Sequence, residues 1–158
     1  MFDVVLYQPE IPPNTGNIMR LCANTSSVLH LIEPLGFSLD ERQLRRAGLD
    51  YREWADVRQH ESLDAYLKHR SPDSLYAFTR NGTAAYADQS YQPGDALLFG
   101  PESVGLPAEV LENEAITARV RIPMVGESRS LNLANTVAVG LYEALRQNGF
   151  PGLEKGAG

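Results

Sequence analysis

Short apolar segments recur along the chain, and polar or amphipathic stretches long enough to form helices separate them. Five such segments have the length and the Val, Ile, Leu and aromatic content of buried strands: residues 4–7, 28–32, 75–79, 96–99 and 118–122. Strands that alternate with helices favour a parallel sheet with helices on both faces. The sequence therefore predicts an α/β fold with a mostly parallel sheet flanked by helices.

Helix signals lie between and after these strands. In residues 38–48, Ser38 and Glu41 stand at capping-box spacing and Gly48 ends the pattern. Residues 62–70 and 106–113 are further candidates, with Pro107 near the first turn of the latter. The strongest pattern covers residues 132–148 and stops at Gly149. Its apolar stripe at helical spacing predicts a buried face made of Leu133, Val137, Gly140, Leu141, Ala144 and Leu145.

Composition indicates one globular domain. The chain has 158 residues, 43% of them hydrophobic and 22% charged. We expect a single domain over residues 1–150 and a flexible tail over residues 151–158. No apolar run reaches membrane length and the first residues do not resemble a signal peptide, so we expect a cytoplasmic protein without a membrane partner. Cys22 is the only cysteine and is expected to be a buried free thiol.

Net charge argues against a protein that coats nucleic acid by charge alone, because the chain carries −6. Two local segments are nevertheless basic. Residues 42–52 hold four arginines against one aspartate, and residues 119–129 hold three arginines against one glutamate. From charge alone, we interpret both segments as solvated faces.

Three loops follow predicted strands and each leads into a helix. They are "QPEIPPNTGN", "GPESVGLP" and "PMVGESRSLNLANT", and all are rich in Gly, Pro, Ser or Asn. In open parallel sheets, ligands bind beyond the carboxyl ends of the strands, so these loops are expected to form one site. Gly100, Gly105 and Gly126 would permit close backbone approach or positive φ, although ordinary turns explain most loop glycines.

Familiar catalytic templates do not match. No P-loop, no strand followed by G-x-G-x-x-G and no G-x-S-x-G elbow occurs. His30, His60 and His69 are far apart in sequence without metal-ligand spacing, so we expect no metal, and His30 within an apolar strand is expected to be structural. Glu102 suits ligand contact or helix capping, and nothing requires that it meet Glu10.

Taken together, the loop segments resemble the three motifs of the SPOUT RNA methyltransferases. The matching segments are "NTGNIMR", "LLFGPESVGLP" and "IPMVGESRSLNLANTVAVGLYEA", in the family's order, and the similarity extends over nearly the whole chain. The resemblance implies a C-terminal deep trefoil knot, S-adenosylmethionine as cofactor, and a homodimer with its active site near the subunit interface. Relatives of this kind methylate the ribose 2′-hydroxyl at wobble position 34 of tRNA, on a cytidine or a modified uridine.

The resemblance also assigns roles to residues. Polar positions matching those implicated in 2′-O-methylation are Asn14, Arg20, Ser130 and Asn132, with Glu102 at the catalytic and cofactor pocket. Cofactor contacts are expected from Phe78, Thr79, Gly100, Glu102, Ile122, Met124, Ser130 and Leu131. Asn135 and Tyr142 are candidate interface or pocket residues. A guanidinium is a poor base, so we expect Arg20 to stabilise charge rather than to accept the proton.

RNA contact would fall to the domain itself, because the chain has no room for a separate RNA-binding domain. The candidate contacts are Arg42, Arg45, Arg46, Arg52, Arg119, Arg121 and Arg129. Val104 stands where relatives often carry a polar or basic residue, so no RNA contact is expected there. Two alternatives stay open: a SPOUT methyltransferase acting on another tRNA or ribosomal RNA position, and an α/β module that binds RNA or a nucleotide without catalysis.

Overall fold

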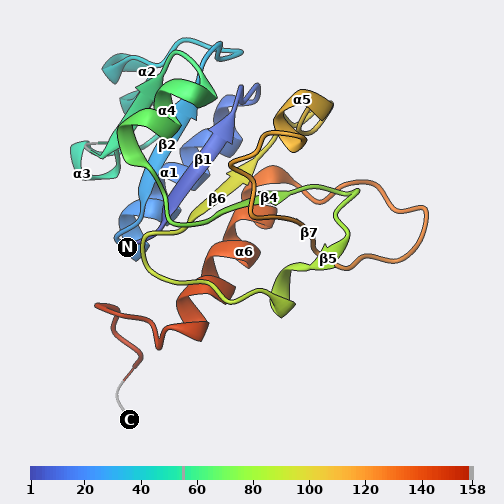
Figure 1. Ribbon diagram of the computed structural model, residues 1–158. Helices are drawn as coiled ribbons and strands as arrows, with labels where there is room; N and C mark the ends of the chain where they lie inside the picture. The colour runs from blue at the N-terminus through green and yellow to red at the C-terminus, as the bar shows by residue number, and fades with distance from the viewer. Residues whose placement is uncertain (55, 157–158) are drawn as a thin grey trace.

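The protein is built around a parallel β-sheet, as a computed structural model that describes residues 1–54 and 56–156 shows (Figure 1). The strands are β1 (Asp3–Tyr7), β2 (Val28–Ile32), β3 (Val57–His60), β4 (Leu75–Phe78), β5 (Ala84–Ala85), β6 (Ala96–Phe99) and β7 (Ala118–Arg121). They form one seven-stranded sheet in the order β3-β2-β1-β6-β4-β7-β5, and every adjacent pair is parallel. The predicted α/β class and all five predicted strands are confirmed.

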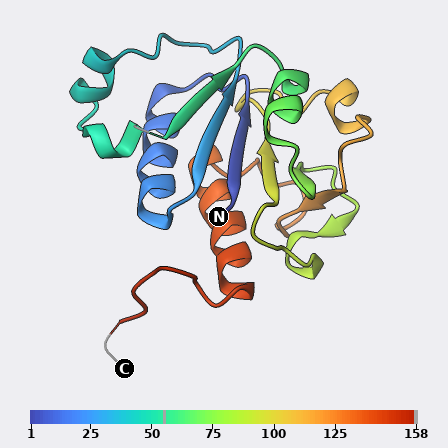
Figure 2. The same cartoon turned by 60° about the vertical axis from the view of Figure 1, so that its left-hand side comes forward.

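Helices cover both faces of this sheet. They are α1 (Pro12–Thr25), α2 (Glu41–Arg46), α3 (Tyr51–Trp54), α4 (Leu63–Arg70), α5 (Ala108–Leu111) and α6 (Leu133–Gln147), with a 3₁₀ turn at Tyr86–Asp88. One core cluster joins α1 and α6 to side chains such as Val4 and Leu6, and a second joins α4 and α5 to Val5 and Leu98. Alternate residues of a strand thus pack into opposite layers. Figure 2 shows helices on both sides of the sheet.

The last helix follows the sequence prediction closely. All six residues of the predicted apolar stripe are buried in α6. Asn132 caps the helix by accepting a 3.3 Å hydrogen bond from the Asn135 amide, and Gly149 beyond its end has φ of 73°. The helix packs beside α1, which begins at the two prolines and carries Asn14 in its first turn.

Other boundaries differ from the prediction. Helix α2 begins at Glu41 and is capped by Asp40, whose carboxylate accepts from the Gln43 amide, so the predicted Ser38 capping box is wrong. The helix α3 and the strands β3 and β5 were not predicted. Strand β3 lies at the sheet edge with its two central residues exposed, so its sequence lacks an apolar run. Strand β5 has only two residues.

The end of the chain is only partly a free tail. Phe150 and Leu153 pack against the core, and residues 157–158 of the expected tail lie outside the described residues. Within the described part of the chain, no helix is long and apolar enough to cross a membrane. Cys22 is buried and free as predicted, and burial raises the pKa of its thiol to about 12.

A buried polar cluster, which we name the Asp3 network, joins Asp3, His30, Tyr66 and Arg70. The Asp3 carboxylate accepts hydrogen bonds from the Tyr66 hydroxyl (2.9 Å) and from Nε and Nη2 of Arg70 (3.0 and 2.8 Å). Nε2 of His30 lies 3.2 Å from the carboxylate, outside good hydrogen-bond geometry. Burial alone would raise the pKa of Asp3, but its contacts with His30 and Arg70 outweigh burial and hold the pKa well below its usual range.

The histidines that are distant in sequence meet in this region. Nδ1 of His30 lies 2.9 Å from Nε2 of His60, and the rings of His60 and His69 are 5.9 Å apart. Among the described residues, however, no group of three or more His, Cys, Asp or Glu side chains could hold a metal ion. His30 is therefore part of a packed network in the core, as the sequence predicted.

Candidate active site

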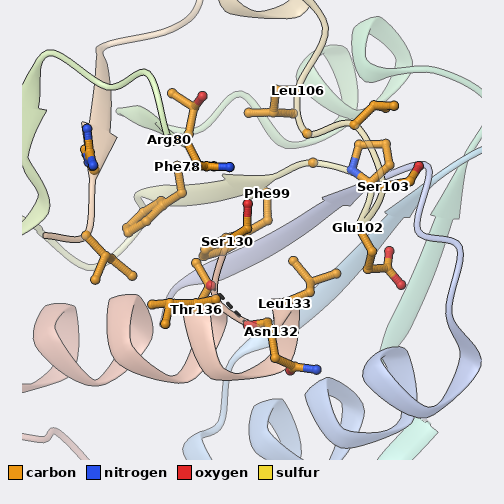
Figure 3. Close-up of a pocket in the computed structure, with 18 of the residues that line it drawn as sticks. Phe78, Arg80, Phe99, Glu102, Ser103, Leu106, Ser130, Asn132, Leu133 and Thr136 are labelled. Carbon is orange, nitrogen blue, oxygen red and sulfur yellow. Dashed lines mark hydrogen bonds between the residues drawn. The ribbon is translucent and has the colours of Figure 1, made fainter. Parts of the chain in front are cut away.

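A polar cavity lies where four loops leave the carboxyl ends of the central strands (Figure 3). Its volume is about 470 Å³, in the range of small-molecule sites. The loops follow β1, β4, β6 and β7, and the start of α6 closes one side. The convergence predicted from topology is confirmed, with the loop after β4 as an addition.

Aromatic packing forms the inner end of the cavity. The rings of Phe78 and Phe99 stack with centroids 4.7 Å apart. The Phe78 ring lies so close to α6 that a Cβ on Gly140 would stand 2.9 Å from it. Helix α6 thereby approaches the sheet closely. Figure 3 shows Thr136 of α6 among the side chains that surround the cavity.

The loop after β6 folds back on itself tightly. A Cβ on Gly100 would lie 2.3 Å from the Leu106 amide nitrogen, and Gly105 has φ of 70°. Both glycines therefore perform the predicted tasks of close approach and positive φ. The prediction for Gly126 is wrong, because open space surrounds it and the positive φ falls on Glu127 (63°) instead.

Polar side chains at the cavity form a chain that we name the amide network: Glu102, Asn14 and Asn132. The Glu102 carboxylate accepts from the backbone amides of Glu10 (2.9 Å) and Ile11 (2.6 Å) and from Nδ2 of Asn14 (3.4 Å). Oδ1 of Asn14 accepts from Nδ2 of Asn132 at 2.9 Å. The network joins three loops, and it holds the Asn14 amide in one orientation.

Glu102 thus performs the work of a cap for the segment that enters α1. The N-cap position, Ile11, offers no side-chain acceptor, and a carboxylate is favoured near the start of a helix. Glu102 contacts Glu10 through the Glu10 backbone amide, and the neighbouring Ser103 donates its hydroxyl to the Glu10 carboxylate at 2.6 Å. Hydrogen bonds from the Ser103 side chain and amide hold the pKa of Glu10 below its usual range.

The cavity collects nearly all of the predicted site residues. Those that line it are Asn14, Phe78, Thr79, Gly100, Glu102, Ile122, Met124, Ser130, Leu131 and Asn132. Ser130 is exposed, and among the described residues its hydroxyl has no hydrogen-bond partner. Val104 also lines the cavity and is largely exposed, whereas Asn135 and Tyr142 do not line it.

Comparison with known proteins decides the family. The sequence profile of the SpoU rRNA Methylase family matches residues 1–142. The chain belongs to the SpoU rRNA methylase family. A tRNA (cytidine(34)-2'-O)-methyltransferase of Escherichia coli K12 is 55% identical over 152 residues, covering 96% of this chain and 97% of the relative. The enzyme of the same name from Saccharophagus degradans is also 55% identical, covering 96% and 99%.

Solved structures agree with this family. A structure described as giving insights into the 2-OH methylation of C/U34 on tRNA has a TM-score of 0.84 and 48% identity, and it covers 94% of this chain and 97% of its own. An AdoMet-bound rRNA methyltransferase from Sinorhizobium meliloti is 24% identical with a TM-score of 0.79, covering 92% of this chain and 56% of its own. At that identity the second likeness supports the fold alone.

Arg20 stands apart from the other predicted site residues of this SpoU family member. It does not line the cavity of its own chain. Its Nε lies 3.0 Å from Oε1 of Glu53, its Nη2 donates to the Gly48 carbonyl at 3.0 Å, and half of its side chain is exposed. Within one chain, the geometry leaves Arg20 on the outer part of α1.

The sequence reasoning missed several cavity residues. Arg80 and Asn81 follow β4, and Leu106, Leu133 and Thr136 are further lining residues. Nη2 of Arg80 donates to the Ser128 carbonyl at 2.7 Å and so ties the loop after β4 to the loop after β7. Ligands bind beyond the carboxyl ends of parallel strands. The same argument, applied to the strand at 75–79, would have added the segment "RNG" that follows it to the predicted site.

Proposed function

We propose that this chain methylates the ribose 2′-hydroxyl at wobble position 34 of tRNA, on a cytidine or a modified uridine, with S-adenosylmethionine as methyl donor. The observation that carries the proposal is the cavity at the three motif loops, in a chain 55% identical over 96% of its length to a tRNA (cytidine(34)-2'-O)-methyltransferase. No separate RNA-binding domain is needed for this reading, because the relatives have nearly the same length.

The residues present suit S-adenosylmethionine. Apolar side chains such as Leu106 and Ile122 offer a surface for an adenine ring. In residues 122–131, the described hydrogen bonds leave most main-chain amides and carbonyls without a partner in the chain, so they can hold polar groups. The residues that would hold the cofactor are Phe78, Thr79, Gly100, Ile122, Met124, Ser130 and Leu131. When bound, it supplies a methyl carbon on sulfonium sulfur, and the bond from ribose oxygen to carbon forms as the carbon–sulfur bond breaks.

The chain's own task is then alignment and charge. Each asparagine amide of the network uses one donor and one acceptor internally, and keeps one of each for the ribose. The free Ser130 hydroxyl adds a further polar contact. Holding reactants in line is worth about 7–11 kcal/mol in favourable intramolecular comparisons. The hydroxyl proton passes to water or to a neighbouring phosphate oxygen, since Glu102 is occupied by hydrogen bonds from the chain.

Arg20 serves the cavity of a partner subunit in this proposal. The protein acts as a homodimer, and Arg20 of one subunit leaves Glu53 to contact an RNA phosphate and the reacting oxygen at the partner's cavity. Its planar guanidinium can donate two hydrogen bonds at once and stabilises developing negative charge. The exposed position of Arg20, outside its own cavity, supports action across an interface.

Complementation between inactive variants tests this assignment. Arg20→Ala and Asn14→Ala are co-expressed with different affinity tags, and the mixed dimer is purified. If Arg20 acts across the interface, one of the two sites in the mixed dimer is intact and methyl transfer returns to about half of the wild-type level. If Arg20 acts on its own cavity, both sites stay damaged and no activity returns.

Two further properties belong to the same proposal. The protein is cytoplasmic. Its C-terminal part is threaded into a deep trefoil knot, which the non-sequential strand order and the packing of α6 against α1 support. A crystal structure that traces residues 118–148 tests the knot.

Arginines at the cavity and elsewhere on the surface contact the RNA. Arg42, Arg46, Arg52 and Arg129 form no hydrogen bond or ion pair among the described residues, although Arg52 interacts electrostatically with Glu53, and Arg121 lines the cavity. Arg45 is paired with Glu41, and Arg119 donates to the Leu111 carbonyl, so both are weaker candidates.

Transfer of a labelled methyl group from S-adenosylmethionine to bulk tRNA, followed by nucleoside mapping, tests the activity. We expect 2′-O-methylation confined to position 34. A methyl group mapped elsewhere in tRNA, or only in ribosomal RNA, would support the alternative substrates instead. Absence of cofactor binding by calorimetry would contradict methyl transfer altogether.

A further inference from the structure

The segment over residues 40–54, which we name the α2–α3 hairpin, exposes most of its surface. Neither α2 nor α3 contains a buried residue. Leu49, in the turn between them, is buried in the core cluster of α1, and Leu44 and Trp54 pack against the same cluster. Figure 2 shows the two short helices beside α1, on the side of the molecule away from α5. The hairpin is therefore an exposed surface that apolar side chains fix to the core beside α1.

Charges in the hairpin are arranged so that guanidinium groups are left over. Asp40 and Asp50 accept from the backbone amides of Gln43 and Glu53 as caps. The other two carboxylates, of Glu41 and Glu53, pair with Arg45 and Arg20. Within the hairpin, the guanidinium groups of Arg42, Arg46 and Arg52 form no hydrogen bond or ion pair among the described residues, although Arg52 interacts electrostatically with Glu53. The formal charges of the hairpin balance, but these three guanidinium groups keep their hydrogen-bond donors available for phosphate groups.

An aromatic ring stands on the same surface. Tyr51 is 74% exposed, and its ring meets the partly buried Trp54 edge-on at a centroid distance of 6.2 Å. With this exposure and a single T-shaped neighbour, at least one face of the Tyr51 ring is open to solvent. Exposed aromatic rings among arginines are the usual means of holding unpaired nucleotides, because bases stack on the rings while the cations contact the phosphates.

The hairpin is fixed close to the cavity. The Leu49 side chain lies 3.7 Å from the position of a Cβ on Gly16, two residues after Asn14 in α1. The Arg20 bonds to Glu53 and Gly48 tie α3 to the same helix. Six residues separate Asn14 from Arg20, about 9 Å along a helix axis. An RNA strand that leaves the cavity along α1 therefore meets the hairpin.

We propose that the α2–α3 hairpin binds an unpaired nucleotide of tRNA, with its base stacked on Tyr51 and the adjoining phosphates held by Arg42, Arg46 and Arg52. The proposal rests on tRNA being the substrate. Tyr51 lies outside the three motif segments, so the proposal adds a stacking residue to the site. It also assigns substrate binding to the hairpin and cofactor binding to the cavity.

Binding of bulk tRNA to Tyr51→Ala, measured by filter binding at two salt concentrations, tests the proposal. Stacking on one aromatic ring is worth about 1–3 kcal/mol, so the affinity for tRNA should fall roughly 5- to 150-fold. Tyr51→Phe keeps the ring and should restore binding. The KM for tRNA should rise in Tyr51→Ala with little change in kcat, and S-adenosylmethionine affinity by calorimetry should be unchanged, which shows that the variant is folded.

A variant that removes one charge provides a second test of the proposal. Arg46→Ala should weaken tRNA binding and lower the salt dependence by about one unit of slope. Lys68→Ala, which removes an exposed charge from α4 on the other face of the sheet, is the matched control.

The outcomes separate this proposal from the proposed activity. If Tyr51→Ala binds and methylates tRNA like the wild type, the hairpin assignment is overturned and the activity stands. If the wild type binds tRNA through Tyr51 but transfers no methyl group, the hairpin assignment stands and the activity is overturned. If the wild type binds no tRNA, both are overturned.

Discussion

The amide network and the Asp3 network lie at opposite ends of β1, and they are built on different principles. In the Asp3 network, a carboxylate only 6% exposed receives three hydrogen bonds and is compensated by Arg70. In the amide network, the Glu102 carboxylate also receives three hydrogen bonds, but all of its partners are neutral amides, and the side chains of Asn14 and Asn132 keep part of their bonding capacity free. The carboxylate that holds the fold is paired with a guanidinium, whereas the carboxylate beside the cavity orients neutral groups that can receive a ligand.

The largest difference between the networks should appear in activity. Asn14→Asp places a second carboxylate opposite Glu102 and removes the amide donor. We expect methyl transfer to tRNA to fall by about 100-fold or more, because small misplacements of reacting groups cost that much. Steady-state kinetics with tRNA measure the change, and thermal unfolding should show a folded protein.

Asn17→Asp is the matched control, since it makes the same change on the exposed side of α1. Its activity should stay near that of the wild type. Equal activity in the Asn14 and Asn17 variants would mean that the amide network has no part in the reaction.

A substitution in the Asp3 network should lower the stability of the protein. Asp3→Asn keeps the side-chain shape but removes the charge that compensates Arg70. Hydrogen bonds to charged groups contribute about 1.5–3 kcal/mol each, so the free energy of unfolding should fall by about 2–3 kcal/mol. Urea denaturation measures this, while cofactor affinity at low temperature should not change. Asp56→Asn, in an exposed pair with Arg58, should change stability very little.

Acid should remove the contribution of the Asp3 network to the stability of the folded protein. The pKa of Asp3 is lower in the folded protein than in the unfolded chain, where it is about 3.9. Its stabilising effect is therefore complete above about pH 4 and is lost as the pH falls towards the folded value. The stability gap between wild type and Asp3→Asn, measured by urea denaturation from pH 7 to pH 3, should narrow below pH 4. A constant gap would show that the carboxylate charge is not responsible.

The smallest expected effect concerns the connection between two cavity loops. Arg80→Ala removes the hydrogen bond to the Ser128 carbonyl. A net contribution of about 1 kcal/mol corresponds to roughly fivefold weaker S-adenosylmethionine binding by calorimetry, with kcat little changed. Arg80→Lys can still donate to the carbonyl and should recover much of the affinity. Weak binding by both variants would point to the guanidinium itself contacting the cofactor.

The sequence predicted those features that depend on local pattern. The apolar stripe of α6 and the end of the helix before Gly149 were evident because helical spacing and the glycine stop are local. The edge strand β3 was missed, since exposure on both faces removes the apolar run that marks a strand. The pairing of Arg20 with Glu53 depends on how α3 packs beside α1. The two residues are 33 positions apart, so a local sequence pattern could not predict that they meet.

The site was predictable to a similar extent and for similar reasons. The convergence of the loops followed from topology, because loops at strand ends meet wherever strands are parallel. The family resemblance then assigned ten lining residues, eight of them in the three motif segments and two, Phe78 and Thr79, at the end of the strand at 75–79. The sharing of Glu102 among Glu10, Ile11 and Asn14 was not predictable, since it depends on the angle at which one loop crosses another.

The close approach of Phe78 to Gly140 links helix design to the binding site. Replacing a glycine within a helix by alanine is a standard way to gain about 1 kcal/mol of helix stability. At position 140 the new methyl group would stand 2.9 Å from the Phe78 ring and would drive that ring toward the cavity. Gly140 touches no ligand, yet its small size keeps the cavity in shape. Substitutions that aim to stabilise α6 must therefore leave this position unchanged.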